Sequence, residues 1–252
     1  MAEPLLVARR MTRRFGGLAA CDGVDLALAR GELHALLGPN GAGKSTLINL
    51  LSGDLAPTSG SILYRGVEIA QLPPDRRSRM GLGRSYQKTN IFPAFTVIEN
   101  ARLAAQSRRP RPWALFADAS GDAAALSRAK RGLELAGLAD HVERQAGALS
   151  HGEQRQLEIA MVLATEPQVL LLDEPLAGMG AEESQRMVAL LKRLSAEHAI
   201  LLVEHDMDAV FALADVITVM VNGQVLESGP PAQIRASANV QRAYLGHEDG
   251  HG

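Results

Sequence analysis

The chain has 252 residues, of which 46% are apolar, 21% charged and 4% aromatic, and this composition excludes the disordered and fibrous classes of protein. Lysine and arginine number 26 against 28 acidic residues, and the formal net charge of −2 argues against a general nucleic-acid binder. Because Cys21 is the only cysteine, no disulfide can form within the chain, and a reducing compartment is expected.

Strand patterns separated by turn signals dominate the first part of the chain. They occupy residues 5–7, 24–28, 33–37, 61–64 and 67–69. The second alternates apolar and polar side chains as a half-buried antiparallel strand does, and the third is mostly apolar. The last two flank Arg65 and Gly66 and predict a hairpin.

The stretch at 90–165 differs from its surroundings, because it is rich in alanine, leucine and arginine and predicts helices. Strand patterns return at 169–172 and 200–203, with helical periodicity at 182–194 between them. A strand–helix–strand unit of this kind favours a parallel sheet. The polar, glycine-rich end at 248–252 is predicted to be disordered.

The apolar runs of the chain are too short to cross a membrane, since a spanning helix needs about 20 apolar residues in a row. The run at 159–164, for example, has six residues and is interrupted by Thr165. The first residues also lack the basic and apolar regions of a signal peptide. We therefore expect no membrane span and no signal peptide, and any work at a membrane requires a membrane partner.

A glycine-rich loop follows the apolar strand at 33–37 and fits the pattern G-x-x-x-x-G-K-[ST] at all four fixed positions, with helical spacing at 45–51 behind it. Backbone N–H groups of such a loop face phosphate oxygens, the helix dipole attracts the same anion, and the lysine neutralises the β- and γ-phosphates. A glycine turn that precedes a helix by chance does not account for this match. The residues expected to bind a nucleoside triphosphate are Gly38, Pro39, Asn40, Gly41, Ala42, Gly43, Lys44, Ser45 and Thr46.

An apolar strand at 169–172 ends in two acids, Asp173 and Glu174. Asp173 is positioned to ligate Mg²⁺ at the edge of the sheet, and Glu174 to polarise a water in line with the γ-phosphate. Two solvated acids at the end of a strand are common, so the functional interpretation depends on the phosphate loop.

Four further motifs resemble those of the ATP-binding-cassette (ABC) ATPases. Residues 149–154, with the sequence LSHGEQ, look like the signature motif of that family. Gln87 matches its Q-loop glutamine, His205 its switch histidine, and Phe15 the aromatic residue that stacks on adenine. The resemblance extends from about residue 5 to 245, and the motifs follow the family's order.

The resemblance implies an α/β fold, a P-loop NTPase whose mixed sheet combines a RecA-like core with an antiparallel β subdomain and an inserted helical subdomain. The chain is then a single domain at 1–247, with the core and β subdomain at 1–89 and 166–235, the helical subdomain at 90–165 and a C-terminal tail at 236–247.

The same resemblance implies roles for individual residues. Glu174, His205 and Gln87 are the expected catalytic residues, and the expected cofactors are ATP and Mg²⁺. Ser45, Gln87 and Asp173 are the expected metal ligands. A lone histidine after a strand is more often structural, but the motif order favours a γ-phosphate contact for His205.

Cassettes of this family work as head-to-tail pairs that sandwich two ATP molecules. Ser150 and Gly152 are therefore expected to contact the ATP held by the Lys44 loop of a second cassette. Phe15 is expected to stack on adenine, although its alternative is core packing.

Five short sequence segments are similar to those of the ATP-binding cassettes of importers of branched-chain amino acids. They lie at 90–93, 95–100, 157–160, 204–207 and 243–246. The expected function is the ATP-hydrolysing subunit of such an importer, with a urea or amide importer as an alternative because those cassettes share much of this sequence. A soluble ABC ATPase that works in regulation or on DNA or ribosomes is a second alternative. A small-molecule kinase would not explain 149–154 or His205.

The implied partners are a second cassette of the same or a related chain, two integral membrane permease subunits, and indirectly an extracytoplasmic substrate-binding protein, with no nucleic acid. The implied location is cytoplasmic, on the inner face of the cell membrane. Ile91, Phe92 and Phe95 are candidates to receive a short helix of the permease. The arginines at 108–111 are expected in a solvated loop, with contact to anionic lipid as the alternative.

Three positions depart from the family pattern. The signature of the family usually has a glycine where this chain has His151, and often a glutamine where it has Glu153. Ser150 and Gly152 match the family pattern. Gly180 stands where a loop after the acids commonly ends in aspartate. This last departure concerns the coupling of hydrolysis across a pair of cassettes, not the binding of ATP.

Overall fold

The computed structural model describes residues 3–85, 90–108 and 122–245. Three expectations therefore lie outside the described residues: those for Gln87, for the part of the arginine cluster at 109–111, and for the end at 248–252.

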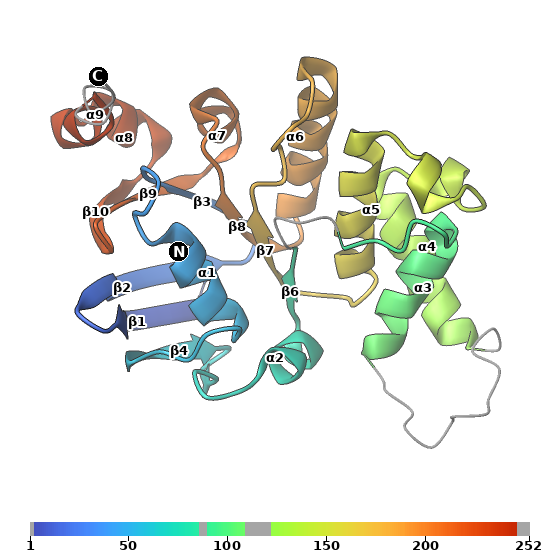
Figure 1. The fold of residues 1–252 in the computed structure, drawn as a ribbon, viewed down its shortest axis with the longest axis horizontal. Coiled ribbons are helices and arrows are strands. Elements are labelled where there is room, and N and C mark those ends of the chain that lie inside the picture. The colour runs from blue at the N-terminus through green and yellow to red at the C-terminus, as the bar shows by residue number, and fades with distance from the viewer. Residues whose placement is uncertain (1–2, 86–89, 109–121, 246–252) are drawn as a thin grey trace.

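Two sheets form the framework of the molecule (Figure 1). One has four antiparallel strands in the order β2 (Leu18–Ala29), β1 (Pro4–Phe15), β4 (Ser59–Tyr64) and β5 (Val67–Glu68). The other has six strands in the order β10 (Gln224–Gly229), β9 (Val216–Val221), β3 (Leu33–Leu37), β8 (Ala199–Val203), β7 (Val169–Asp173) and β6 (Leu82–Arg84). Only the β9–β10 pair of this second sheet is antiparallel. The predicted mixed α/β architecture is confirmed.

The helices pack around the second sheet, and α3, α4 and α5 gather at one end of the molecule, beyond β6 (Figure 1). Their bounds are α1 (Lys44–Ser52), α2 (Pro74–Met80), α3 (Val97–Ser107), α4 (Ala123–Ala136), α5 (His151–Leu163), α6 (Ala181–Ser195), α7 (Met207–Leu213), α8 (Pro231–Ala236) and α9 (Ala238–Leu245). Within the described ranges, none of these helices combines the length and apolar character needed to cross a bilayer.

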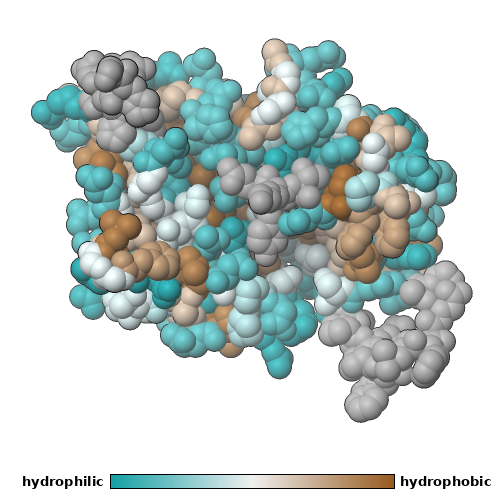
Figure 2. All heavy atoms as spheres, in the orientation of Figure 1, coloured by the Kyte–Doolittle hydropathy of each residue, from teal (hydrophilic) through white to brown (hydrophobic). Residues whose placement is uncertain are grey.

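The core is built on both faces of the six-stranded sheet, because successive side chains of a strand point to opposite faces. In β7, Val169 and Leu171 face the cluster that includes α1 and the four-stranded sheet. Leu170 and Leu172 face the cluster formed with α3–α6. Both faces are covered, so β7 and β8 read as continuous apolar runs in the sequence. On the face shown in Figure 2, hydrophilic side chains predominate and the hydrophobic patches are separated.

Some elements differ from the sequence expectations. β1 extends to Phe15, well beyond the predicted strand at 5–7. The sequence pattern missed this length because the alternation of side chains is interrupted at Arg10, which has φ 46° and lies where the pairing register with β2 shifts, between Ala8 and Met11. The patterns also missed α2, β6 and the β9–β10 hairpin. The hairpin around Arg65 and Gly66 is confirmed, and both residues have positive φ there.

Arg77 of α2 holds the end of the helix that follows the phosphate loop. Its side chain is 1% exposed, and its guanidinium donates to four backbone carbonyls. They are those of Leu50 (2.6 Å), Leu51 (2.8 Å), Leu72 (2.9 Å) and Ala70 (2.8 Å). The first two belong to the last turn of α1, whose carbonyls have no partner within the helix. Arg77 therefore places a cation where the helix dipole is negative.

We predict that Arg77→Met lowers the free energy of unfolding by about 3 to 5 kcal/mol, because it leaves buried carbonyls without donors. Urea titration of both proteins measures this difference. Arg79→Met on the same helix is the matched control, since Arg79 forms a partly exposed ion pair with Asp75 that is worth about 1 kcal/mol or less. Equal losses in the two variants would contradict the role given to Arg77.

Candidate functional site

Three adjacent parallel strands bring the sequence motifs to one edge of the sheet. β3 pairs with β8, β8 pairs with β7, and Val203 lies opposite both Leu36 and Asp173. The residues that follow these strands are Gly38, Glu174 and Glu204, so the phosphate loop, the two acids and His205 emerge side by side (Figure 1). The edge beyond the carboxyl ends of parallel strands is where α/β proteins bind ligands.

The phosphate loop is wedged between β2 and the end of β9, and two of its glycines have no substitute there. A Cβ on Gly38 would lie 2.2 Å from the Met220 carbonyl oxygen, and one on Gly43 would lie 2.2 Å from that of Ala20. Both glycines also have positive φ, at 152° and 101°. Buried Cys21 adds an Sγ contact to the Gly43 oxygen at 3.6 Å, and burial raises the pKa of this thiol to about 12.

The N-terminus of α1 is open for an anion. Gly43 is its N-cap and provides no side chain to satisfy the first N–H groups of the helix. Ser45 is exposed and Thr46 is half-buried, so the hydroxyl of Ser45 faces accessible space.

Lys44 places a positive charge inside the loop. Its side chain is 8% exposed, and Nζ donates to the carbonyls of Gly38 (2.6 Å) and Pro39 (3.0 Å). Burial lowers the pKa of Lys44, while the charges of Glu174 and Asp173 oppose this shift. The structure thus places Lys44 near enough to the two acids for their charges to interact.

Asp173 is a buried carboxylate with an arginine beside it. The residue is 6% exposed, burial raises its pKa, and the opposing influence is the Arg84 guanidinium, whose Nη2 lies 3.9 Å from Oδ2. Arg84 also donates to Ser52 Oγ at 2.6 Å and pairs with Asp54. Sequence analysis missed Arg84 because it ends β6, a strand that no pattern indicated.

Glu174, which follows the last residue of β7, has a left-handed backbone conformation. Its φ is 50°, in the left-handed region that side chains rarely adopt, and its N–H donates to the Val203 carbonyl at 2.9 Å. Such strain is concentrated at functional positions. The side chain of Glu174 is half-buried, whereas that of Asp173 is buried.

Glu204 joins the loop after the acids to the loop that carries His205. Its carboxylate is 1% exposed and accepts from Leu176 N (2.8 Å) and His205 N (3.2 Å). The His205 ring is 66% exposed, with Nδ1 3.8 Å from Glu204 Oε2. Sequence analysis missed Glu204, although a carboxylate between an apolar strand and a candidate histidine was the available signal.

Phe15 stands at the tip of the β1–β2 hairpin and is 46% exposed, so its ring is accessible. The guanidinium of Arg13 lies 4.6 Å from the centre of the ring, a cation–π distance. The same hairpin supplies Ala20 against Gly43, which brings this tip to the side of the phosphate loop. Stacking on adenine stays a prediction.

Ser150 and Gly152 lie elsewhere, at the N-terminus of α5. Ser150 caps this helix, and its Oγ accepts from Glu153 N at 3.3 Å while Glu153 Oε2 accepts from Ser150 N at 2.7 Å. This reciprocal box accounts for glutamate at 153. Figure 1 separates α5 from α1, with β7 and β8 between them. One chain therefore does not join its signature to its own phosphate loop.

Oxygen ligands dominate the predicted metal site. The described residues include no group of three or more His, Cys, Asp or Glu side chains that could hold a metal by themselves. Ser45 and Asp173 offer a hydroxyl and a carboxylate beside the phosphate loop, a donor set that suits Mg²⁺ once nucleotide phosphates complete it. Gln87 falls outside the described residues, so its part stays a prediction.

Comparisons with known proteins agree with this geometry. The profile of the family described as "ABC transporter" matches residues 21–177, and that of "Branched-chain amino acid ATP-binding cassette transporter" matches 224–250. The chain is 42% identical to the high-affinity branched-chain amino acid transport ATP-binding protein LivG of Escherichia coli strain K12, over 98% of this chain and 99% of that protein. It is 40% identical to BraF of Pseudomonas aeruginosa, a protein with the same description, at the same coverage.

A solved structure is similar over nearly its whole length. The ADP conformation of MJ1267, an ATP-binding cassette of an ABC transporter, aligns with a TM-score of 0.87 and 27% identity, covering 97% of this chain and 100% of that one.

We predict that Glu204 makes the stability of the protein depend on pH. Burial raises its folded-state pKa above the ordinary 4.5, so the native state retains a proton that the unfolded chain has lost. The contribution of Glu204 to stability then falls as pH rises from 4.5 through the folded pKa. The free energy of unfolding of Glu204→Gln minus that of wild type should therefore increase as the pH of the urea titrations rises above 4.5. Glu182→Gln is the control, and a difference that stays constant would count against this prediction.

Proposed function

The chain belongs to the ABC transporter family, and from this premise we propose that it is the ATP-hydrolysing subunit of an importer of branched-chain amino acids. ATP-binding proteins of this family are ATPases, so nucleotide binding and hydrolysis follow from membership. The proposal is carried by the edge where the phosphate loop, the two acids and His205 emerge together. The solute is supported by the descriptions of LivG and BraF and by the profile matched at the C-terminal end.

In this proposal ATP lies along the phosphate loop at the start of α1. Backbone N–H groups of residues 40–46 and the helix dipole receive its β- and γ-phosphates. Lys44 exchanges its contacts with the Gly38 and Pro39 carbonyls for phosphate oxygens, which place full negative charge beside the buried ammonium. Phe15 stacks on adenine, with Arg13 against its ring.

Ser45, Asp173 and Gln87 are the proposed holders of Mg²⁺. The fit rests on the exposed hydroxyl of Ser45 and on the buried Asp173 carboxylate, which a cation would stabilise in its charged form. Bound Mg²⁺ supplies positive charge to the β- and γ-phosphates.

Glu174 is the proposed general base. Its carboxylate takes a proton from the water that attacks the γ-phosphorus, and its strained backbone fixes the direction of the side chain. His205 donates to the γ-phosphate. Glu204 holds the backbone of His205 and of Leu176 at hydrogen-bond distance, so both loops keep their spacing while the reaction proceeds.

A second cassette completes each site. Ser150, at the N-terminus of α5, lies apart from the phosphate loop of the same chain. It can therefore face the ATP of a partner that binds head to tail. Because the γ-phosphate joins the two chains, ATP favours the closed pair and hydrolysis releases it. The partner is either a second copy of this chain or a related cassette.

The proposed partners beyond the pair are two permease subunits, with an extracytoplasmic binding protein that delivers the solute. The docking surface is the aromatic pair Phe92 and Phe95, whose rings stack at 5.3 Å and are 47% and 44% exposed. Exposed stacked aromatics suit an amphipathic helix. Asn90 of the same segment lines a cavity of about 200 Å³ together with residues of β6, α3 and α5. The chain would lie on the cytoplasmic face of the membrane.

The first test concerns the chemistry. Glu174→Gln keeps the shape of the side chain but cannot accept a proton, so kcat should fall about 10² to 10⁴-fold while ATP still binds. Phosphate release measures the loss, and sedimentation should detect dimers that persist with ATP. Unchanged turnover in this variant would refute the role of Glu174, and affinity for ATP that does not depend on magnesium would refute the metal site.

The second test concerns the partner and the solute. The variant Phe92→Ala with Phe95→Ala should lose association with the permease subunits and leucine uptake, because the docking surface loses its rings. ATP hydrolysis by the isolated chain reports on the fold in the same experiment. Leu226→Ala removes another exposed apolar side chain, on β10, and is the matched control. Uptake of urea or amides instead of leucine, or co-purification with nucleic acid, would overturn the proposal.

A further inference from the structure

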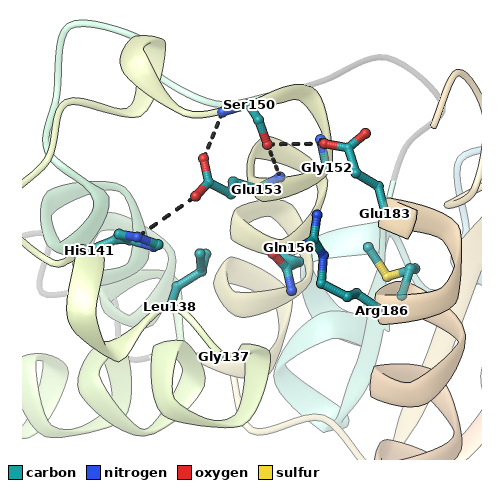
Figure 3. A pocket seen from close by; sticks show the side chains of 10 residues that line it. Gly137, Leu138, His141, Ser150, Gly152, Glu153, Gln156, Glu183 and Arg186 are labelled. Atoms are coloured by element: carbon teal, nitrogen blue, oxygen red, sulfur yellow. Dashed lines mark hydrogen bonds and ion pairs between the residues drawn. The ribbon is translucent and has the colours of Figure 1, made fainter. Parts of the chain in front are cut away.

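Ser150 Oγ and Gly152 N are the hydrogen-bond donors of the signature and together form its anion seat. This seat already holds a carboxylate of its own chain. Glu183, in the first turn of α6, accepts with Oε1 from Ser150 Oγ at 3.1 Å and from Gly152 N at 3.2 Å (Figure 3). The N–H of Gly180, the N-cap of α6, also donates to this carboxylate. Donors from the N-termini of two helices thus converge on one anionic group.

Both helices are long enough to attract an anion, since α5 and α6 have 13 and 15 residues. The fit at the seat is close, because a Cβ on Gly152 would lie 2.8 Å from the Glu183 carboxylate. Its hydrogen bonds, first that from Ser150 and then that from Gly152, lower the pKa of Glu183. The occupant is therefore an anion at neutral pH, bound by the donors that suit a phosphate oxygen.

We infer that Glu183 regulates the ATPase reaction. Its carboxylate occupies the signature seat, where the γ-phosphate of a partner's ATP would bind, and it must leave before that ATP can enter. This inference rests on the proposed function, because it assigns the seat to ATP held by a second cassette. A carboxylate and a γ-phosphate cannot share Ser150 Oγ and Gly152 N, since each would leave the other without donors and the two anions repel.

The departing side chain has a place to go. A cavity of about 270 Å³ adjoins the seat and is lined by Glu183, Gln156, His141 and Arg186. Arg186 lies one turn along α6, where it pairs with Glu182 at 3.3 Å (Figure 3 shows its side chain in the cavity wall). A change of rotamer at Glu183 toward this guanidinium exchanges one set of charge-assisted contacts for another.

The departure of this chain from its family at residue 180 belongs to the same arrangement. Gly180 has φ −70° and ψ 165°, a conformation open to any residue, and nothing lies within 4 Å of a Cβ placed there. Glycine at 180 is thus not required by the backbone. With glycine at 180, the N-cap of α6 brings no carboxylate of its own to this helix end.

The occupied seat lowers the fraction of chains ready to pair, and the apparent affinity of ATP-driven pairing falls by that fraction. Two seats close in each pair, so the effect acts twice. ADP has no γ-phosphate and binds within one chain, and its affinity is therefore independent of Glu183.

The test uses the full chain with Glu174→Gln, so that ATP is bound and not consumed. Glu183→Gln removes the charge at the seat, and Glu197→Gln removes the same charge at an exposed position beyond the C-terminus of α6. Sedimentation across an ATP titration measures the ATP concentration at which half of the chains are paired. With Glu183→Gln this concentration should fall at least about fivefold, whereas Glu197→Gln should leave it unchanged.

Two further measurements distinguish a regulatory role of Glu183 from a structural one. ADP affinity and the thermal midpoint should be the same in both variants, and in chains with Glu174 intact the KM for ATP should fall with little change in kcat. Glu183→Asp keeps the charge on a side chain one methylene shorter and should give an intermediate midpoint, which preserves the test if Glu183→Gln folds poorly.

An unchanged or higher pairing midpoint for Glu183→Gln would overturn the inference, as would an equal fall for Glu197→Gln, which would reveal a general effect of charge. If the Glu174→Gln parent fails to pair at any ATP concentration, the proposed function falls and the inference falls with it.

Discussion

The parallel hydrogen bonding of β3 to β8 and of β8 to β7 is the constraint on which the nucleotide site depends. Three segments far apart in the sequence leave the sheet at one edge only because these strands run in the same direction. Covering both faces of the sheet with apolar side chains fixes the register, since a shift of one residue would exchange the side chains of the two faces. The positions of the phosphate loop, Glu174 and His205 therefore follow from core packing rather than from contacts among themselves.

Buried charged side chains hold the loops that this edge provides. Arg77 binds the last carbonyls of α1, Arg84 lies beside Asp173, and Glu204 ties Leu176 to His205. A buried ion is stable only when hydrogen bonds satisfy it, so each of these residues fixes its neighbours in one arrangement. A site that binds a highly charged ligand gains from this rigidity, because the donors need no reorganisation when phosphate arrives.

The signature region has the opposite character, because its donors lie apart from the phosphate loop of their own chain. The residues that depart from the family are linked there by contact: Glu153 completes the cap of Ser150, and His151 Nε2 lies 3.3 Å from the Ala177 carbonyl oxygen. The Glu183 carboxylate bridges α5 and α6 at the same place. In a single chain, the N-terminus of α1 is thus open to an anion, whereas that of α5 holds the Glu183 carboxylate. In the inferred pairing step, the γ-phosphate of the partner's ATP replaces this carboxylate at α5.

The amino-acid sequence by itself determined the phosphate loop, the acidic strand end and the alternation of sheet and helix, because contiguous residues and local periodicity carry these features. It left out α2, β6 and the full length of β1, where a bulge at Arg10 breaks the alternation. Only the tertiary structure decided that Arg84 faces Asp173 and that Glu183 reaches Ser150, 33 residues away. Such pairs join elements distant in the chain, and a charged residue on a strand end or helix turn gives no local sign of which partner folding will bring to it.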